Sequence, residues 1–260
     1  MHSVRTGTGK PLVLVHGLGS SIGNWDPVVP ALSASREVIA VDLPGFGRTP
    51  PLAGEVTIGA LTDSVADFLR QRDLTDVDLV GSSMGAQMVL ELARRGHAGT
   101  VVALDPGGFW NSAQAAIFAT SIKASITLVR RVQPLLSALT ANPVGRTSLL
   151  GQFSAAPWKL PRDLVLQELR GFTKTASPSL DAALTALVKG PRQEGMTPGT
   201  ERGKIVIGWG RHDRVTLPSQ AKTATAKFPT ASLHWFSRCG HFPHWDQPEQ
   251  TVQLILDSTA

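Results

Sequence analysis

Ser83 lies at the centre of a Gly-x-Ser-x-Gly pattern formed by residues 81–85. Residues 78–80 before it are predicted to form a strand, and residues 84–95 after it have the composition of a helix. A serine on a tight strand-to-helix turn holds its hydroxyl clear of the sheet, and the flanking glycines let the helix approach the strands. We therefore expect Ser83 to attack a carbonyl carbon; the alternative is a turn of small residues without chemistry.

A serine hydroxyl attacks well only when a base removes its proton, and that base is commonly a histidine held by a carboxylate. Asp213 follows a predicted strand at residues 204–207, and His241 follows another at residues 233–236. The carboxyl ends of parallel strands meet at one edge of a sheet, where open α/β sheets place their ligand sites. We therefore expect both side chains to lie beside Ser83.

Other residues of the same types compete for these two roles. Asp105 follows an apolar run at residues 101–104 and is a second candidate for the acid. Three further histidines compete with His241. We expect His16 to stabilise its own loop, and we expect His212 and His244 to lie at the surface or behind the site.

The segment around His241 also contains residue types that bind metals. His241, His244 and Asp246 have a spacing that would suit a metal ion, but a gap of three residues also arises by accident in loops. We therefore predict no metal site. The one cysteine, Cys239, is expected to be a small buried residue rather than a nucleophile.

Backbone amides are the predicted groups for binding negative charge. Met84 begins the helix after Ser83, and the N-terminal amides of a helix favour an anion. A glycine-rich turn at residues 16–21 exposes a second amide, that of Leu18, and lacks the third glycine of a dinucleotide-binding loop. We expect the N–H groups of Leu18 and Met84 to form an oxyanion hole.

These residues need a scaffold that brings distant parts of the chain together. Short runs that are apolar throughout predict buried parallel strands, at residues 12–15, 38–41, 77–80, 101–104, 205–207 and 233–236. Segments with helical character lie between them, at residues 58–72, 84–95, 218–227 and 248–257. The alternation of strand and helix indicates an α/β fold with helices on both faces of the sheet.

The alternation stops between residues 109 and 200, where prolines separate amphipathic stretches and no strand is predicted. The sequence therefore predicts a core made of residues 1–108 and 201–260, with a helical cap at residues 109–200. Large aromatic side chains are the candidates for an apolar pocket between the two: Trp25, Phe109, Trp110, Phe153, Trp158 and Phe242.

Composition excludes several classes of protein. The chain has 260 residues, 42% of them hydrophobic and 17% charged, which excludes a disordered chain. Its net charge of +5 is spread thinly, so no nucleic-acid surface is predicted. The start is polar without a signal peptide, no run has the length of a membrane span, and a single cysteine excludes internal disulfides. A cytoplasmic protein is expected.

Several short motifs resemble those of the α/β-hydrolase superfamily, in its compact, cap-bearing members. They are His16-Gly17, Asn24-Trp25, the string from Asp42 to Gly47, the string from Gly81 to Gly85, the string from Gly210 to Asp213, and Gly240-His241. The resemblance implies a mostly parallel, doubly wound sheet with a helical cap inserted after the sixth strand. It favours Asp213 over Asp105 as the acid, in the chain order serine, acid, histidine.

The sequence departs from the pattern of this superfamily in two places. Ser82 stands where a histidine often precedes the nucleophile, and the chain starts close to its first long strand, so the usual leading strands are expected to be shortened or absent. A serine at position 83 also implies acyl chemistry, whereas relatives with aspartate there form alkyl esters.

The expected function is hydrolysis of a small hydrophobic carboxylic ester, thioester or lactone through an acyl-enzyme on Ser83, with no cofactor. Carbon–carbon bond hydrolysis of a vinylogous diketone by the same triad is the nearest alternative. Peracid formation at Ser83 and a ligand receptor that retains the triad with little turnover are further alternatives. The expected partner is a small apolar molecule, without nucleic acid or stable membrane insertion, and homo-oligomerisation is left open.

Overall fold

Seven strands form one sheet in the computed structural model, which describes residues 1–260. In chain order they are β1 (Ser3–Thr6), β2 (Pro11–Val15), β3 (Glu37–Val41), β4 (Asp78–Ser82), β5 (Val101–Leu104), β6 (Ile205–Gly210) and β7 (Ser232–Phe236). Their order across the sheet is β1-β3-β2-β4-β5-β6-β7, and only β1 is antiparallel to its neighbour. The predicted mostly parallel sheet is confirmed.

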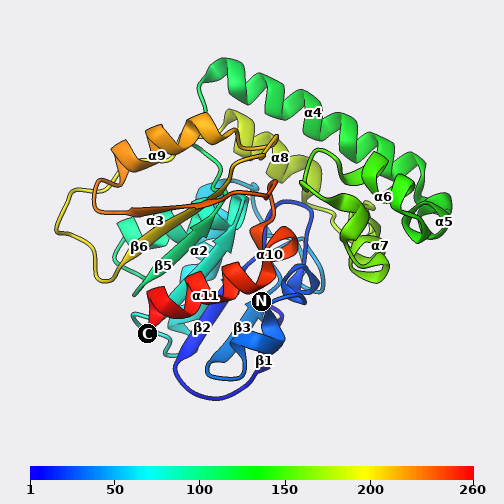
Figure 1. Ribbon diagram of the computed structural model, residues 1–260. Helices are drawn as coiled ribbons and strands as arrows, with labels where there is room; N and C mark the ends of the chain where they lie inside the picture. Colours follow the sequence, from blue (N-terminus) through cyan, green and yellow to red (C-terminus); the bar gives the residue numbers. More distant parts are fainter.

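Helices cover both faces of this sheet (Figure 1). Besides the segment between β5 and β6, they are η1 (Ile22–Trp25), α1 (Val29–Leu32), α2 (Ile58–Arg70), α3 (Met84–Arg94), η4 (Pro218–Gln220), α9 (Ala221–Lys227), α10 (Pro243–Asp246) and α11 (Pro248–Thr259). Strand residues alternate between two cores. Val13 and Leu79 pack with α2, α3 and α9, whereas Leu12 and Val80 pack with α1 and α11. The doubly wound arrangement is therefore confirmed.

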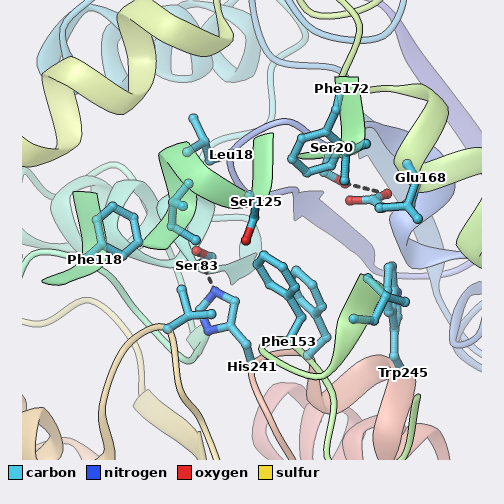
Figure 2. A pocket seen from close by; sticks show the side chains of 17 residues that line it. Leu18, Ser20, Ser83, Phe118, Ser125, Phe153, Glu168, Phe172, His241 and Trp245 are labelled. Atoms are coloured by element: carbon cyan, nitrogen blue, oxygen red, sulfur yellow. Dashed lines mark hydrogen bonds between the residues drawn. The ribbon is translucent and has the colours of Figure 1, made fainter. Parts of the chain in front are cut away.

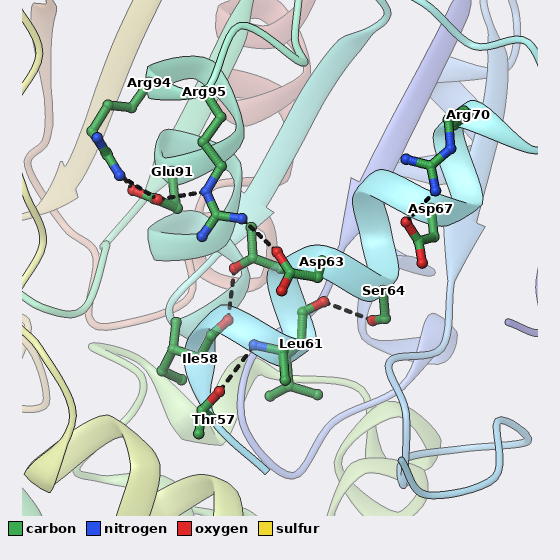
Figure 3. A network of polar contacts seen from close by, with 12 residues as sticks. Thr57, Ile58, Leu61, Asp63, Ser64, Asp67, Arg70, Glu91, Arg94 and Arg95 are labelled. Carbon is green, nitrogen blue, oxygen red and sulfur yellow. Dashed lines mark hydrogen bonds and ion pairs between the residues drawn. The ribbon is translucent and has the colours of Figure 1, made fainter. Parts of the chain in front are cut away.

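Ion pairs on one face fix α3 against α2. Arg95 lies 2.5 Å from Asp63 of α2 and 2.6 Å from Glu91, and Arg94 lies 2.8 Å from Glu91 (Figure 3). Single exposed pairs contribute only about 0–1 kcal/mol. Because these pairs share partners across two helices, they add orientation to the apolar packing of the helix that follows Ser83.

Five helices and two 3-10 turns lie between β5 and β6 and extend beyond one edge of the sheet (Figure 1). They are α4 (Ser112–Arg131), η2 (Gln133–Leu135), α5 (Leu136–Ala141), α6 (Pro143–Leu150), η3 (Pro157–Lys159), α7 (Arg162–Arg170) and α8 (Leu180–Lys189). Most of the residues of a small separate core belong to this α4–α8 segment, among them Leu136, Leu150 and Val165. By length and composition alone, α4 is apolar enough to cross a membrane, but Phe118, Ile122 and Ile126 pack into the main core.

The structure differs from the sequence prediction in three elements. β1 was not predicted, because it is a four-residue edge strand with three exposed residues and no apolar run. The α4–α8 segment follows the fifth strand rather than the sixth, because a single short strand precedes β2. The helix predicted over residues 218–227 begins as the 3-10 turn η4, and α9 covers only its second part.

Candidate active site

Ser83 occupies a strained turn between β4 and α3. Its backbone has φ 56° and ψ −113°, a left-handed region that is costly for a residue with a side chain. Its N–H donates to Leu104 O at 2.9 Å, which ties the turn to β5. The two flanking glycines permit this geometry: a Cβ on Gly81 would lie 2.4 Å from Gly85 O, and one on Gly85 would lie 2.2 Å from Val15 O.

Adding one methyl group at Gly85 tests this close approach. We expect Gly85→Ala to lower the free energy of unfolding by about 3 kcal/mol, because overpacking forces α3 away from β2. Urea denaturation measures the effect. The matched control is Gly59→Ala in α2, where the nearest atom to the new Cβ is Thr57 Oγ1 at 3.7 Å. It should change stability by less than about 1 kcal/mol, and an equal loss in both variants would contradict the interpretation.

His241 connects Ser83 to Asp213 through two hydrogen bonds. His241 Nε2 lies 2.9 Å from Ser83 Oγ (Figure 2), and His241 Nδ1 lies 2.9 Å from Asp213 Oδ2. All three side chains are buried, with exposed fractions of 8% for Ser83, 3% for Asp213 and 2% for His241. The three residues that the sequence singled out therefore meet at the carboxyl edge of the sheet.

The carboxylate of Asp213 is held by the turn that follows it. Its Oδ1 accepts the N–H groups of Val215 at 2.7 Å and Thr216 at 3.1 Å, and its Oδ2 accepts the hydroxyl of Thr216 at 2.7 Å. These three hydrogen bonds fix the orientation of the carboxyl group. Asp213 thus presents an anchored acceptor to the Nδ1–H of His241, which leaves Nε2 free to accept a proton from Ser83.

Asp105, the competing acid, lies behind this pair. Its Oδ1 accepts the N–H of Gly210 at 2.8 Å, and no hydrogen bond joins it to His241. Burial raises its pKa well above the usual range, and the negative charge of Asp213 raises it further. Asp105 therefore lies beside the acid that contacts the histidine, in surroundings that disfavour a second negative charge.

Two clusters in the structure contain residue types that bind metals. Ligand atoms of Asp105, Asp213 and His241 lie within 4.8 Å of one another, but both Asp213 oxygens and His241 Nδ1 already have hydrogen-bond partners. In the second cluster, His244 Nε2 is 2.6 Å from Asn24 Oδ1, and Asp246 accepts the backbone amides of Ala155 and Gly240.

The other histidines lie where they cannot replace His241. His16 accepts the N–H of Leu43 at Nε2 and lies 2.8 Å from Gly17 O at Nδ1, so it stabilises the loop after β2, and burial lowers its pKa. His212 is exposed. Burial lowers the pKa of His244 to about 3, with the neighbouring His241 adding to the shift.

The loop that carries His241 is attached to the α4–α8 segment. The N–H of His241 donates to Phe153 O at 2.6 Å. Asp246 Oδ2 accepts the N–H of Gly240 at 2.7 Å and that of Ala155 at 2.8 Å, so one carboxylate joins the two loops. The position of the base therefore depends on residues 153–155.

Cys239 lies next to this loop and is fully buried. Burial raises the pKa of its thiol, and nearby negative charges raise it further. We expect iodoacetamide at about pH 8 to leave the native protein unalkylated and fully active, because the thiolate is the reactive form. Mass spectrometry measures the reaction, and alkylation in urea is the control. Rapid alkylation of the folded protein would contradict this assignment.

A pocket opens above Ser83 and His241 (Figure 2). Leu18 lines it, and a Cβ on Gly17 would lie 3.0 Å from Ser83 Cβ, so the turn after β2 passes directly beside Ser83. Met84 is the first residue of α3, and the first amides of a helix have no partner within it. The two amides predicted for an oxyanion hole thus belong to segments that flank Ser83.

Only two of the six predicted pocket aromatics line this pocket, Phe153 and Phe242. The other four predictions were wrong. Trp25 is fully buried in the core that contains Leu12 and Val80, Phe109 and Trp110 are part of the main core, and Trp158 is 48% exposed. Large aromatic residues more often pack in a core than contact a ligand, and Trp25, Phe109 and Trp110 follow this tendency.

Several lining residues were not identified from the sequence. Four share one face of α4 at helical spacing, namely Phe118, Ile122, Ser125 and Val129; others are Ser20, Leu150, Glu168, Leu169, Phe172, Val215 and Trp245. The helical spacing of Phe118, Ile122 and Val129 was visible, but nothing in it indicated which apolar face covers a site. No lysine or arginine lines the pocket, and Glu168 is its one acidic residue.

Comparisons with known proteins identify the family. The profile of the alpha/beta hydrolase family matches residues 12–254. The chain belongs to this family. This alpha/beta hydrolase is 26% identical over 270 residues to a 2-hydroxy-6-oxononadienedioate/2-hydroxy-6-oxononatrienedioate hydrolase from Comamonas testosteroni, covering 100% of the chain and 91% of the relative. It is 28% identical over 274 residues to a 2-hydroxy-6-oxo-2,4-heptadienoate hydrolase from Pseudomonas putida, covering 100% and 92%.

Solved structures share the fold of this alpha/beta hydrolase. A thermophilic esterase from Thermogutta terrifontis superimposes with a TM-score of 0.76 at 21% identity, covering 98% of this chain and 91% of the esterase. The enol-lactonase from Burkholderia xenovorans LB400 superimposes with a TM-score of 0.74 at 18% identity, covering 98% and 95%. At such identities the similarity establishes the fold alone.

Proposed function

We propose that this hydrolase uses Ser83 as its nucleophile, His241 as its general base and Asp213 as the group that orients the histidine. The observation that carries the proposal is the pair of 2.9 Å contacts that joins the three side chains at the wall of a pocket. His241 takes the proton as Ser83 Oγ attacks a carbonyl carbon, and the amides of Leu18 and Met84 stabilise the oxyanion. The α4–α8 segment acts as the cap.

The bond proposed for cleavage is a carbon–carbon bond next to a ketone, in a vinylogous diketone. The sequence favoured an ester, but the curated relatives bear the names of carbon–carbon bond hydrolases of meta-cleavage type and support the alternative better. When Ser83 adds to the ketone, the departing carbon takes the bonding electrons into its conjugated carbonyl as an enolate. His241 returns the proton to this fragment, and water then releases the acyl group from Ser83.

The pocket restricts the kind of diketone. No lysine or arginine lines it, so it offers no cation for a carboxylate tail. Most of its lining side chains are hydrophobic, which favours a small substrate with an apolar body. We therefore propose a diketone whose tail carries no negative charge.

We also propose that the enzyme acts in the cytoplasm.

Three compounds test this proposal. They are a vinylogous diketone with an uncharged tail, its counterpart 2-hydroxy-6-oxo-6-phenylhexa-2,4-dienoate, and p-nitrophenyl butyrate. Loss of dienol absorbance measures carbon–carbon cleavage, and p-nitrophenolate release measures esterolysis. We expect the highest kcat/KM on the uncharged diketone. Rapid cleavage of the ester without cleavage of either diketone would contradict the assignment of the bond.

Ester hydrolysis is the second candidate, because the triad also suits esters and an apolar, cation-free pocket accepts an uncharged acyl chain. The same assay distinguishes the two candidates. It also tests the proposal that the protein is an enzyme, since a receptor that retains the triad would bind one of these compounds tightly with little turnover.

A further inference from the structure

Glu168 is a buried acid inside the pocket whose role the triad does not explain. It lies on α7, its side chain is 8% exposed, and its carboxyl points towards Ser20 on the loop after β2 (Figure 2). Ser20 Oγ donates to Glu168 Oε2 at 3.1 Å. The figure shows this pair across the pocket from Ser83 and His241.

A carboxyl group in such surroundings is costly unless a ligand or a protein group compensates it. Eleven of the 17 residues that line the pocket are hydrophobic, and an unpaired ionised group in an apolar cavity loses its hydration. Burial raises the pKa of Glu168 to about 7; the contacts with Ser20 and Asn24 lower it, and the charge of Asp26 raises it. No cation is among the lining residues to pair with it.

We infer that Glu168 and Ser20 form a recognition site for the far end of the substrate, which carries a hydrogen-bond donor, a hydroxyl or a protonated amine, and that they exclude substrates ending in a carboxylate. A carboxylate has about four acceptor positions, so the bond from Ser20 leaves capacity for a ligand. A second carboxylate at this position would meet like charge in a low dielectric. This inference rests on the proposed role of Ser83 as nucleophile.

Glu168 also joins two parts of the fold, because α7 belongs to the α4–α8 segment and Ser20 to the sheet's loops. A purely structural tie of this kind would affect all substrates alike. Recognition would instead change the order of preference among substrates that differ only in their terminal group, and this difference decides between the two roles.

The test uses alkyl fluorophosphonates whose far end carries a methyl, hydroxyl, ammonium or carboxylate group, in several chain lengths. Ser83 Oγ forms a bond to phosphorus, fluoride leaves, and the serine proton passes to His241. We expect the hydroxyl and ammonium probes to react about tenfold faster than the methyl probe in at least one chain length. The carboxylate probe should react more slowly than the methyl probe in every length.

Glu168→Gln keeps the shape and the contact with Ser20 but cannot ionise. In this variant, with every rate taken relative to the methyl probe of the same protein, we expect the ammonium preference to fall about tenfold and the carboxylate probe to recover. The matched control is Asp163→Asn, which removes one negative charge from an exposed position of α7. The order of the four probes should be unchanged in this control.

The outcomes separate this inference from the proposed function. If no probe labels the wild-type protein, the role of Ser83 is wrong. If all label it but Glu168→Gln keeps the wild-type order, or slows all four equally, the recognition site is wrong. A wild-type preference for the carboxylate probe would also overturn it.

The pH dependence of probe selectivity is a second measurement, and a purely structural role for Glu168 would leave it unchanged. Because Glu168 has a pKa of about 7, it is mostly protonated below that pH and ionised above it. The rate ratio of ammonium to methyl probe should therefore rise between about pH 6 and 8 in the wild type and stay flat in Glu168→Gln. Taking a ratio removes the pH effects that the two probes share. Asp26, whose charge acts on Glu168, and His244, which contacts Asn24, remain in both proteins. A flat wild-type ratio would contradict the inference.

Discussion

Ser83→Ala is expected to lower kcat by about 10⁶ on whichever carbonyl substrate the enzyme accepts. In the proposed mechanism the hydroxyl at this position forms the covalent intermediate, and it is the hydroxyl that contacts His241 Nε2. The residual rate would come from the oxyanion amides and from substrate binding. Steady-state kinetics measures the loss, and a fluorophosphonate probe followed by mass spectrometry shows whether the variant is still labelled.

Ser82 provides a matched control for this experiment. It is the preceding residue, is fully buried, and its hydroxyl has no hydrogen-bond partner. Replacing an unpartnered hydroxyl with a hydrogen is close to neutral, so Ser82→Ala should keep both activity and labelling. Turnover that survives Ser83→Ala unchanged would show that another residue is the nucleophile.

Asp213→Asn is expected to lower kcat by about 10⁴. An amide in place of the carboxylate can donate to His241 Nδ1, which favours the tautomer with hydrogen on Nε2 and so blocks proton transfer from Ser83. The imidazolium that forms in the transition state also loses its compensating charge. The loss should appear in kcat with little change in the thermal unfolding midpoint, which circular dichroism measures.

Asp105→Asn is the control for the acid. Because burial and the charge of Asp213 raise the pKa of Asp105, and Asp213 rather than Asp105 contacts His241, asparagine supplies a neutral group of the same shape. It can still accept the N–H of Gly210, so kcat should change by less than about tenfold. If Asp105→Asn were the more damaging of the two substitutions, the assignment of the triad acid would be reversed.

The sheet and the triad could be predicted because their signals are local. The central strands are buried on both faces, so they appear as uniformly apolar runs, and each functional side chain directly follows such a run. The glycines on either side of Ser83 are a further local signal, because the turn leaves no room for a side chain at either position. The parallel arrangement then brings Ser83, Asp213 and His241 to one edge.

The pocket could not be predicted in the same way, because its walls depend on how α4 and α7 pack over the sheet. Phe118 and Trp110 are both large aromatic residues and both are buried, yet only Phe118 lines the cavity. Glu168 gave no signal either, since a glutamate on an amphipathic helix is usually solvent-exposed. β1 was missed because an exposed edge strand does not need apolar residues.

The attachment of the histidine loop to residues 153–155 has a mechanical consequence. If the whole α4–α8 segment swung away from the sheet as one rigid lid, it would pull on the amide of His241 and on Asp246, and the general base would leave its place beside Ser83. If His241 is to stay beside Ser83 while a ligand enters or leaves, the α4–α8 segment must therefore move at a place other than residues 153–155. The same hydrogen bonds therefore hold both His241 and the part of the pocket wall at Phe153.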